Sequence, residues 1–131
     1  MTQEQKDILL KDLCARLPYG VKVEYENEIF DVEYVCPMYE EVKLDIPETW
    51  TIDVSEVKPY LFPLSSMTEE QKKEYDSIIY HNVELHWEKY YDVIDVDWYE
   101  ELHDFYNKNH LDYRGLIPMG LANDATGLNI Y

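Results

Sequence analysis

Carboxylates and a histidine gather in one acidic part of the chain, around DVIDVDWYEE at residues 92–101, where they could bind a metal ion. Carboxylate oxygens at this density are suitable ligands for Ca²⁺ or Mg²⁺. The D-x-D spacing is common by chance, however, and the glycine and terminal glutamate of an EF-hand loop are absent. The pattern therefore favours acids at a helix N-terminus, which the helix dipole stabilises, over a metal site. The residues of that alternative site are Asp92, Asp95, Asp97 and His103.

Motifs that assemble a catalytic centre are missing from the sequence. It contains no G-x-S-x-G, P-loop or G-x-G-x-x-G motif, and only four glycines. Ser65 and Ser66 precede an expected helix start, which accounts for small polar residues there without a nucleophile. Cys14 and Cys36 belong to no C-x-x-C pair, and we expect them to be reduced residues that fill the core. The sequence leans away from an enzyme, and we expect no cofactor.

The charge of the chain restricts its partners. There are 28 acidic and 11 basic residues, which give a net charge of −17. Because the basic residues are scattered, direct binding to nucleic-acid phosphates is not expected, and a basic protein is the favoured partner. No apolar run approaches the ~18 residues that cross a bilayer, and the N-terminus is polar. We therefore expect a cytoplasmic protein that does not enter membranes.

Alternating apolar and polar residues predict an antiparallel sheet. VKVEYE at residues 21–26 and IFDVEY at residues 29–34 make a hairpin if Asn27 and Glu28 form its two-residue loop. In that register Val23 faces Val32, Lys22 faces Glu33, and Glu24 faces Asp31 in an unfavourable like-charge pair. The segments EVKLDI at 41–46 and TWTIDV at 49–54 continue the alternation.

The two faces of this sheet are expected to differ sharply in polarity. The residues expected to face the core include Val21, Val23, Tyr25, Phe30, Val32, Tyr34, Val42, Leu44, Ile46, Trp50, Ile52 and Val54. The acids expected on the opposite face, and proposed as a binding surface, are Glu24, Asp31, Glu33, Glu41, Asp45 and Asp53.

Three helices complete the predicted fold. Thr2 and Thr68 each stand three residues before a glutamine, the capping-box pattern, and predict helices over residues 3–16 and from 69 to at least 80. A third helix is expected over 96–108, closed by Asn109 in a left-handed conformation. Residues 82–94 fit either a helix or a strand, and a break at Asn82 followed by a short edge strand is favoured.

Together these elements predict one α+β domain over residues 1–131. We expect an antiparallel sheet of about four strands with about three helices packed on its apolar face.

The segment NKNHLDYRGLIPMGLA at residues 107–122 is predicted to close the fold rather than to bind a ligand. In so acidic a chain, Arg114 is expected to be held by a carboxylate such as Asp112 or one on the third helix. The apolar residues that follow are expected to seal the core behind it, and they are Leu116, Ile117, Met119 and Leu121.

Three segments give the chain a family resemblance: LPYGVK at 17–22, VKPYLFPLSSMTEEQKKEY at 57–75 and NKNHLDYRGLIPMGLA at 107–122. They resemble a family of small acidic proteins carried by bacteriophages and mobile elements of gut Bacteroidetes. The family pattern places a tryptophan shortly before the last segment, whereas Trp98 lies well upstream of it here. The resemblance implies a phage or mobile-element origin, and it brings neither an established activity nor catalytic residues.

The resulting functional expectation is a non-enzymatic protein-interaction module, for example a host-directed inhibitor that uses the acidic sheet face. One alternative is a metal-dependent or hydrolytic enzyme with an acidic and histidine site near residues 92–104. A further alternative is a nucleic-acid mimic, since acids and tyrosines together can imitate phosphate charge and base stacking. The sequence leaves the oligomeric state open.

Overall fold

The computed structural model describes the backbone of residues 1–47, 50–88 and 96–131, and the side chains of those residues outside 81–99. It is a single-domain α+β structure with a mixed sheet of six strands in the order β4-β3-β2-β1-β5-β6. Every neighbouring pair is antiparallel except β5 and β6, which are parallel. The strands are β1 (Lys22–Tyr25), β2 (Glu28–Cys36), β3 (Glu41–Leu44), β4 (Thr51–Asp53), β5 (Lys58–Leu61) and β6 (Asn123–Asp124).

The expected α+β class is confirmed, and the expected four-stranded antiparallel sheet is only roughly right. Strands β1 to β4 coincide with the segments predicted from alternation. No strand was predicted for β5 or β6, and these two strands pair Tyr60 with Asn123, which lies 63 residues further along the chain. A two-residue strand has no alternation to detect, so its pairing depends on the tertiary fold.

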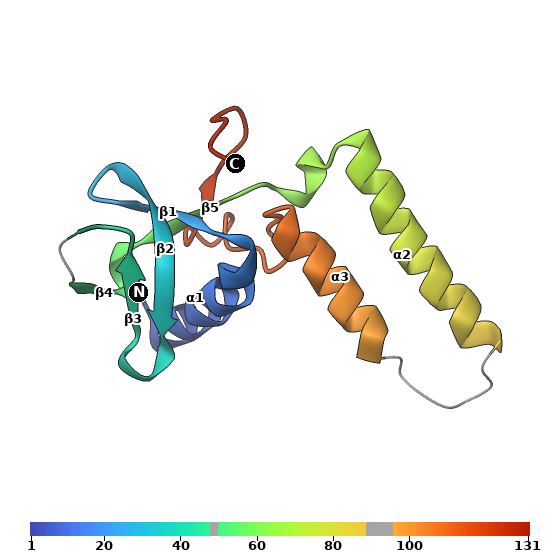
Figure 1. The fold of residues 1–131 in the computed structure, drawn as a ribbon, viewed down its shortest axis with the longest axis horizontal. Helices are drawn as coiled ribbons and strands as arrows, with labels where there is room; N and C mark the ends of the chain where they lie inside the picture. Colours follow the sequence, from blue (N-terminus) through green and yellow to red (C-terminus); the bar gives the residue numbers. More distant parts are fainter. Residues whose placement is uncertain (48–49, 89–95) are drawn as a thin grey trace.

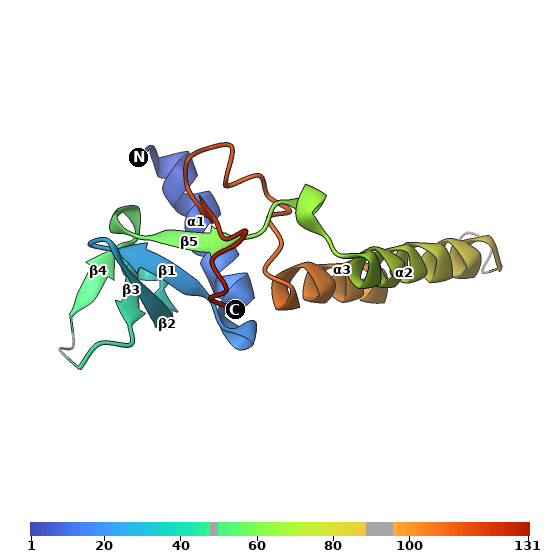
Figure 2. The same cartoon turned by 90° about the horizontal axis from the view of Figure 1, so that it is seen from above.

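The helix α1 (Gln3–Arg16) packs on the apolar face of the sheet, as Figures 1 and 2 show. Its start is the predicted capping box: the Gln5 backbone N–H donates to Thr2 Oγ1 at 3.1 Å, and the Thr2 N–H donates to Gln5 Oε1 at 2.9 Å. Leu9 and Leu13 are fully buried there against the strands. Burial of this stripe, rather than intrinsic helix propensity, stabilises α1.

The helices α2 (Glu69–Glu88) and α3 (Val96–Lys108) form a hairpin that extends away from the sheet (Figure 1). The expectation that all three helices cover one face of the sheet is therefore wrong. Phe105 and Ile78 are buried in a second, smaller apolar cluster between these two helices. Lys108 Nζ of α3 also forms an ion pair with Glu74 Oε1 of α2 at 2.5 Å.

The region after Tyr80 differs from the favoured prediction of a break at Asn82 followed by an edge strand. The backbone continues as helix to Glu88, so the helical alternative is correct as far as that residue. The rest of the ambiguous segment, residues 89–94, lies outside the described residues. α3 ends at Lys108 as predicted, but the left-handed residue after it is His110, with φ of 57°, rather than Asn109.

The β1–β2 hairpin has the predicted faces in a different register. Its loop is Glu26–Asn27, with φ of 50° and 64°, and not Asn27–Glu28. Val23 therefore opposes Phe30. The shift of two residues keeps the paired side chains, from Lys22 to Tyr25 and from Glu28 to Asp31, on their predicted faces because side chains alternate with a period of two. The predicted repulsive pair of Glu24 with Asp31 is replaced by Lys22 opposite Asp31.

Two aromatic residues expected in the core are exposed. The pairing of β2 with β3 shifts between Val32 and Tyr34, so Val35 rather than Tyr34 packs against the core. This β-bulge leaves Tyr34 44% exposed. Trp50 precedes the edge strand β4 and is 76% exposed. Alternation places a residue on a face, but it does not show whether a helix covers that part of the face.

Candidate functional site

The side of the sheet that faces away from α1 is the surface on which most sequence-predicted binding acids lie. We call it the outer sheet face. Its central side chains alternate with the buried Val23, Val42 and Leu44, so they point away from the core. This face consists of Lys22, Glu24, Ile29, Asp31, Glu33, Tyr34, Glu41, Lys43, Asp45 and Thr51, and Asp53 lies at its β4 edge, within reach of α1.

Intramolecular ion pairs neutralise half of the predicted acidic residues. Lys22 Nζ lies 2.8 Å from Asp31 Oδ1, and Lys43 Nζ lies 2.6 Å from Glu33 Oε2. Asp53 Oδ1 lies 3.5 Å from an α1 lysine, Lys6 Nζ, and also accepts hydrogen bonds from the Ser55 backbone N–H and hydroxyl. The Ser55 hydrogen bonds, assisted by Lys6, lower the pKa of Asp53. Both lysines were predicted on this face, but Lys22 was predicted opposite Glu33, whereas the structure pairs it with Asp31 and pairs Glu33 with Lys43.

The other three acids belong to none of the ion pairs found among the described side chains. Glu24 lies opposite Lys58 in the β1–β5 ladder and beside the Tyr60 hydroxyl. Burial, together with Glu24, raises the pKa of Tyr60. Glu41 and Asp45 continue the row on β3 and just after it. These three carboxylates are available to a cationic partner without loss of an intramolecular ion pair.

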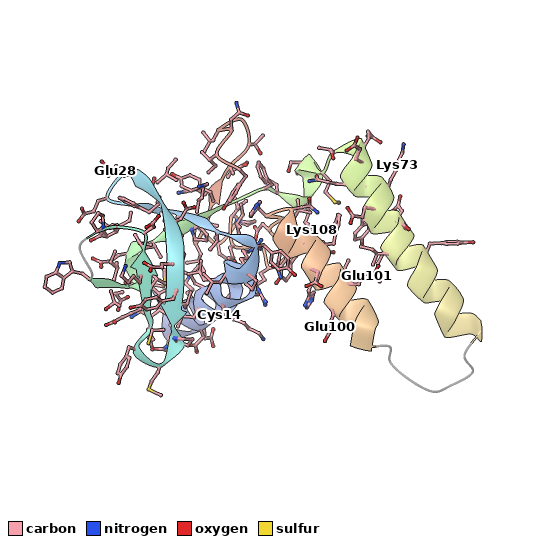
Figure 3. The ribbon with its side chains drawn as sticks, viewed as in Figure 1. Cys14, Glu28, Lys73, Glu100, Glu101 and Lys108 are labelled. Atoms are coloured by element: carbon pink, nitrogen blue, oxygen red, sulfur yellow. The ribbon has the colours of Figure 1, made fainter. Side chains whose placement is uncertain are left out.

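Apolar side chains are exposed on and around the same face. Ile29 and Tyr34 are 45% and 44% exposed on β2, and Figure 3 shows Glu28 at the start of that strand, at the tip of the hairpin. Met38 and Tyr39 are exposed in the turn between β2 and β3. Aromatic residues and methionine are enriched in protein–protein interfaces. The surface therefore combines apolar anchors with carboxylates.

The alternative metal site is only partly described. Asp92 and Asp95 lie outside the described residues, and so does the side chain of Asp97. His103 lies on α3, where its ring stacks on Tyr113 at a centroid distance of 5.3 Å. Among the side chains that are described, no group of three or more His, Cys, Asp or Glu residues is arranged to hold a metal ion.

A shallow groove lies beside the exposed Cys14 on α1, which Figure 3 labels. Its lining also includes Asp7, Leu10, Lys11 and Pro37. Partial burial raises the pKa of the Cys14 thiol, so the reactive thiolate is disfavoured. The expectation that Cys14 fills the core is wrong, and the groove offers no activated nucleophile.

A buried ion cluster joins α1 to the C-terminal segment. Asp12 Oδ2 lies 2.7 Å from Arg16 Nε, and Asp12 Oδ1 lies 3.2 Å from Arg114 Nε. The side chains of Asp12 and Arg16 are fully buried, and Arg16 Nη2 donates to the Leu111 carbonyl oxygen at 2.7 Å. Both guanidinium groups also lie over the ring of Tyr113. This cluster holds the segment after α3 against α1.

The closing segment therefore uses a different carboxylate from the one expected. Asp12, and not Asp112, holds Arg114. Asp112 instead accepts hydrogen bonds from the backbone N–H groups of Leu116 and Ile117, at 2.8 and 2.9 Å. Leu116 is fully buried and Ile117 packs against the core, whereas Met119, expected to help seal it, is 40% exposed.

The cluster could have been inferred in part from the sequence. Asp12 and Arg16 are spaced i,i+4, and they lie on the same side of α1 as Leu9 and Leu13. Opposite charges on an apolar helical stripe indicate a buried ion pair. The sequence did not indicate that Arg16 would bind Leu111 or that Asp12 would bind Arg114. Each of these contacts joins residues about a hundred positions apart.

A second arrangement that the sequence did not reveal surrounds Tyr131. Its hydroxyl accepts from the Lys22 backbone N–H at 3.0 Å and donates to the Tyr60 carbonyl oxygen at 2.8 Å. Its ring stacks on His110, with centroids 3.5 Å apart and planes 13° apart. Burial raises the pKa of Tyr131 to about 12. Burial, with Arg16 and Lys22 nearby, lowers the pKa of His110 to about 4, so the imidazole is neutral at pH 7.

Comparisons of the chain with protein-family models, with curated proteins and with solved structures find no match. No helix in the described part of the chain is both long enough and apolar enough to cross a membrane.

Proposed function

We propose that this chain is a non-enzymatic protein-binding module and that the outer sheet face is its contact surface. The observation that supports the proposal best is that α1 covers the other face, while the outer sheet face presents apolar side chains among carboxylates. Exposed Ile29 and Tyr34 lie beside the charged row of β1 and β3. An exposed sheet face of this composition suits a protein partner better than a small molecule, which needs a concave site.

The partner that fits this face is a basic protein surface. With a net charge of −17, the chain attracts cationic partners over a distance set by the salt concentration. The carboxylates that pair with Lys22 and Lys43 are more than half exposed, so a cationic partner can reach them and compete for these ion pairs. Because Lys22 and Lys43 interrupt the carboxylates, we do not extend the proposal to mimicry of nucleic acid.

The resemblance to proteins of phages and mobile elements supports a host protein as the first partner to seek. Inhibition of that protein by occupation of its basic surface is the corresponding hypothesis for the biological role. We do not propose a reaction, since the described residues supply no activated nucleophile and no assembled acid–base pair.

The decisive experiment compares two charge reversals of equal size. One variant carries Glu24→Lys, Glu41→Lys and Asp45→Lys, the outer-face acids that lie in no ion pair found among the described side chains. The matched control carries Glu69→Lys, Glu70→Lys and Asp76→Lys on the exposed surface of α2. Tagged wild-type protein is used to capture partners from a gut Bacteroidetes lysate, and binding of each purified partner is then measured at low and high salt.

We expect the outer-face variant to weaken the salt-sensitive interaction by at least about tenfold, and the α2 variant to retain it within about twofold. Circular dichroism confirms that both variants are folded. Equal weakening by the two variants would show that net charge alone drives capture. Retention by both would reject the outer sheet face as the contact surface.

A further inference from the structure

We infer that the residues around the Tyr131 ring form a binding site for a phenol, which Tyr131 fills in cis and which a tyrosine side chain of another protein can fill in its place. We call this site the phenol seat, formed by the Lys22 amide, the Tyr60 carbonyl, and the rings of His110 and Phe62. The inference does not depend on the proposed role of the outer sheet face.

The first support is the way in which the seat recognises a hydroxyl group. β1 pairs with β5 at Val23 with Pro59 and at Glu24 with Lys58, so the same register would place Lys22 opposite Tyr60. At that position the Tyr131 hydroxyl bonds to both backbones, accepting from the Lys22 N–H and donating to the Tyr60 carbonyl. A group that donates and accepts at one atom satisfies both strands, whereas a methyl group leaves both unpaired.

The second support is that the seat also selects a flat ring. The His110 ring lies 3.5 Å from the Tyr131 ring and nearly parallel to it, and Phe62 approaches at 6.0 Å with its plane tilted by 57°. His110 is fixed by the backbone: the Phe62 N–H donates to its carbonyl at 2.8 Å, and its own N–H donates to the Asn107 carbonyl at 3.2 Å. The backbone that carries both rings is therefore held by the body of the protein and not by Tyr131.

The third support is the weak attachment of the segment that carries Tyr131. Among the described residues, the last backbone hydrogen bond from this segment to the body is from the Ala125 N–H to the Leu61 carbonyl, at 2.8 Å. The later backbone bond, from Leu128 to Ala125, lies within the segment itself. Among the described contacts, the Tyr131 side chain then makes the next hydrogen bonds to the body. Tyr131 thus behaves as a tethered ligand, present at an effective concentration on the order of millimolar.

The seat also lies where a partner could reach it. Tyr131 is 40% exposed although its hydroxyl is paired, and Figure 1 shows the C-terminal segment beside β5. The side chain of Lys22, whose amide forms part of the seat, belongs to the outer sheet face. A partner that withdraws Tyr131 could insert its own tyrosine at the margin of that face.

The test uses the full chain with Tyr131→Ala and p-cresol as the probe. We expect p-cresol to raise the melting temperature of this variant in a saturable way and to shift the backbone amide resonance of Lys22. Toluene, which has the same ring without the hydroxyl, should bind about tenfold more weakly because two hydrogen bonds are missing. Tyr80→Ala is the matched control, since Tyr80 is 66% exposed on α2, and p-cresol should not stabilise it.

Equal binding of toluene and p-cresol, or the absence of saturable binding, would overturn the inference. If Tyr131→Ala does not fold, Tyr131→Phe replaces it, because this substitution keeps the ring and loses only the hydroxyl. In that chain p-cresol should displace the phenyl ring at position 131 and restore the Lys22 amide resonance to its wild-type position, and toluene should not. Failure of p-cresol to do so in Tyr131→Phe would equally reject a phenol seat.

Discussion

At the scale of single residues, the carboxylate of Asp12 holds two guanidinium groups, one from its own helix and one from the C-terminal segment. A buried ion pair contributes little compared with a well-packed apolar pair, because its charges lose their hydration. Removal of one member of the pair is strongly destabilising, because the remaining charge is then buried without compensation. Asp12 is therefore more important for stability than the exposed acids.

We predict that Asp12→Ala lowers the free energy of unfolding by about 3–5 kcal/mol, because it leaves buried Arg16 without its carboxylate. Urea denaturation followed by circular dichroism measures the loss. Asp31→Ala is the control, since the Asp31 side chain is 57% exposed, and it should cost less than about 1 kcal/mol. Similar losses in the two variants would contradict the role given to Asp12.

His110 makes stability depend on pH. Its native pKa of about 4 lies below the ordinary value of 6.5, so the unfolded chain binds the proton first as the pH falls. Neutral His110 thus contributes fully to the free energy of unfolding above about pH 6.5, and this contribution is lost progressively as the pH falls toward 4. His110→Asn, which tolerates the left-handed backbone at this position, should flatten the dependence between these pH values. Denaturant midpoints of the wild type and of this variant, measured across these pH values, test the prediction. Parallel curves for the two proteins would show that His110 does not cause the pH dependence.

At the scale of elements, the β1–β2 hairpin shows how a loop fixes a register. Both loop residues, Glu26 and Asn27, have positive φ, as a type I′ turn requires. Asparagine tolerates this region and glutamate does not favour it. This register nevertheless places Lys22 opposite Asp31 and avoids the like-charge pair of Glu24 with Asp31.

Replacement of Glu26–Asn27 by Asn–Gly should therefore stabilise the protein by about 1 kcal/mol, because this pair is the preferred sequence for a type I′ turn. Glu28→Gly serves as the matched comparison. It would help if the loop were Asn27–Glu28, whereas in the observed register it weakens the start of β2. Urea midpoints that rise for Glu28→Gly and not for the double variant would indicate the other register.

At the scale of the whole molecule, the excess of negative charge opposes compaction. Seventeen net negative charges repel one another, and the eight ion pairs found among the described side chains offset this only locally. Most of these pairs are at least partly exposed, so each contributes little. We therefore expect added salt to stabilise the folded protein, because it weakens the overall repulsion more than it weakens the ion pairs.

Raising NaCl from about 20 mM to about 500 mM at pH 7 should increase the melting temperature by roughly 5 °C, because the Debye length becomes shorter than typical spacings between surface charges. Thermal melts measure the shift. The same melts near the sequence pI of about 4.3 provide the control, since the net charge there is close to zero and the shift should largely vanish. A melting temperature that falls with salt at pH 7 would mean that ion pairs outweigh the repulsion.

Most local features were predictable from the sequence, because they depend on neighbours along the chain. The capping pattern and apolar stripe of α1 gave its bounds, Gln3–Arg16, and the same reasoning placed α3 at Val96–Lys108. Alternation gave the correct faces for Val23, Val32 and Leu44, because a register shift of two residues leaves each side chain on the same face of the sheet. It did not give the register, which the loop geometry decides.

By itself, the amino-acid sequence determined the α+β class, the helix starts, the sheet faces and the excess of negative charge. The tertiary structure alone decided that Lys22 pairs with Asp31 and Lys43 with Glu33, that Arg114 pairs with Asp12, and that Tyr131 lies between β1 and β5. The physical reason is that each of these contacts joins groups whose separation is set by register or by chain closure. Such contacts leave no period or spacing in the sequence, and they form only when the packed core brings the partners together.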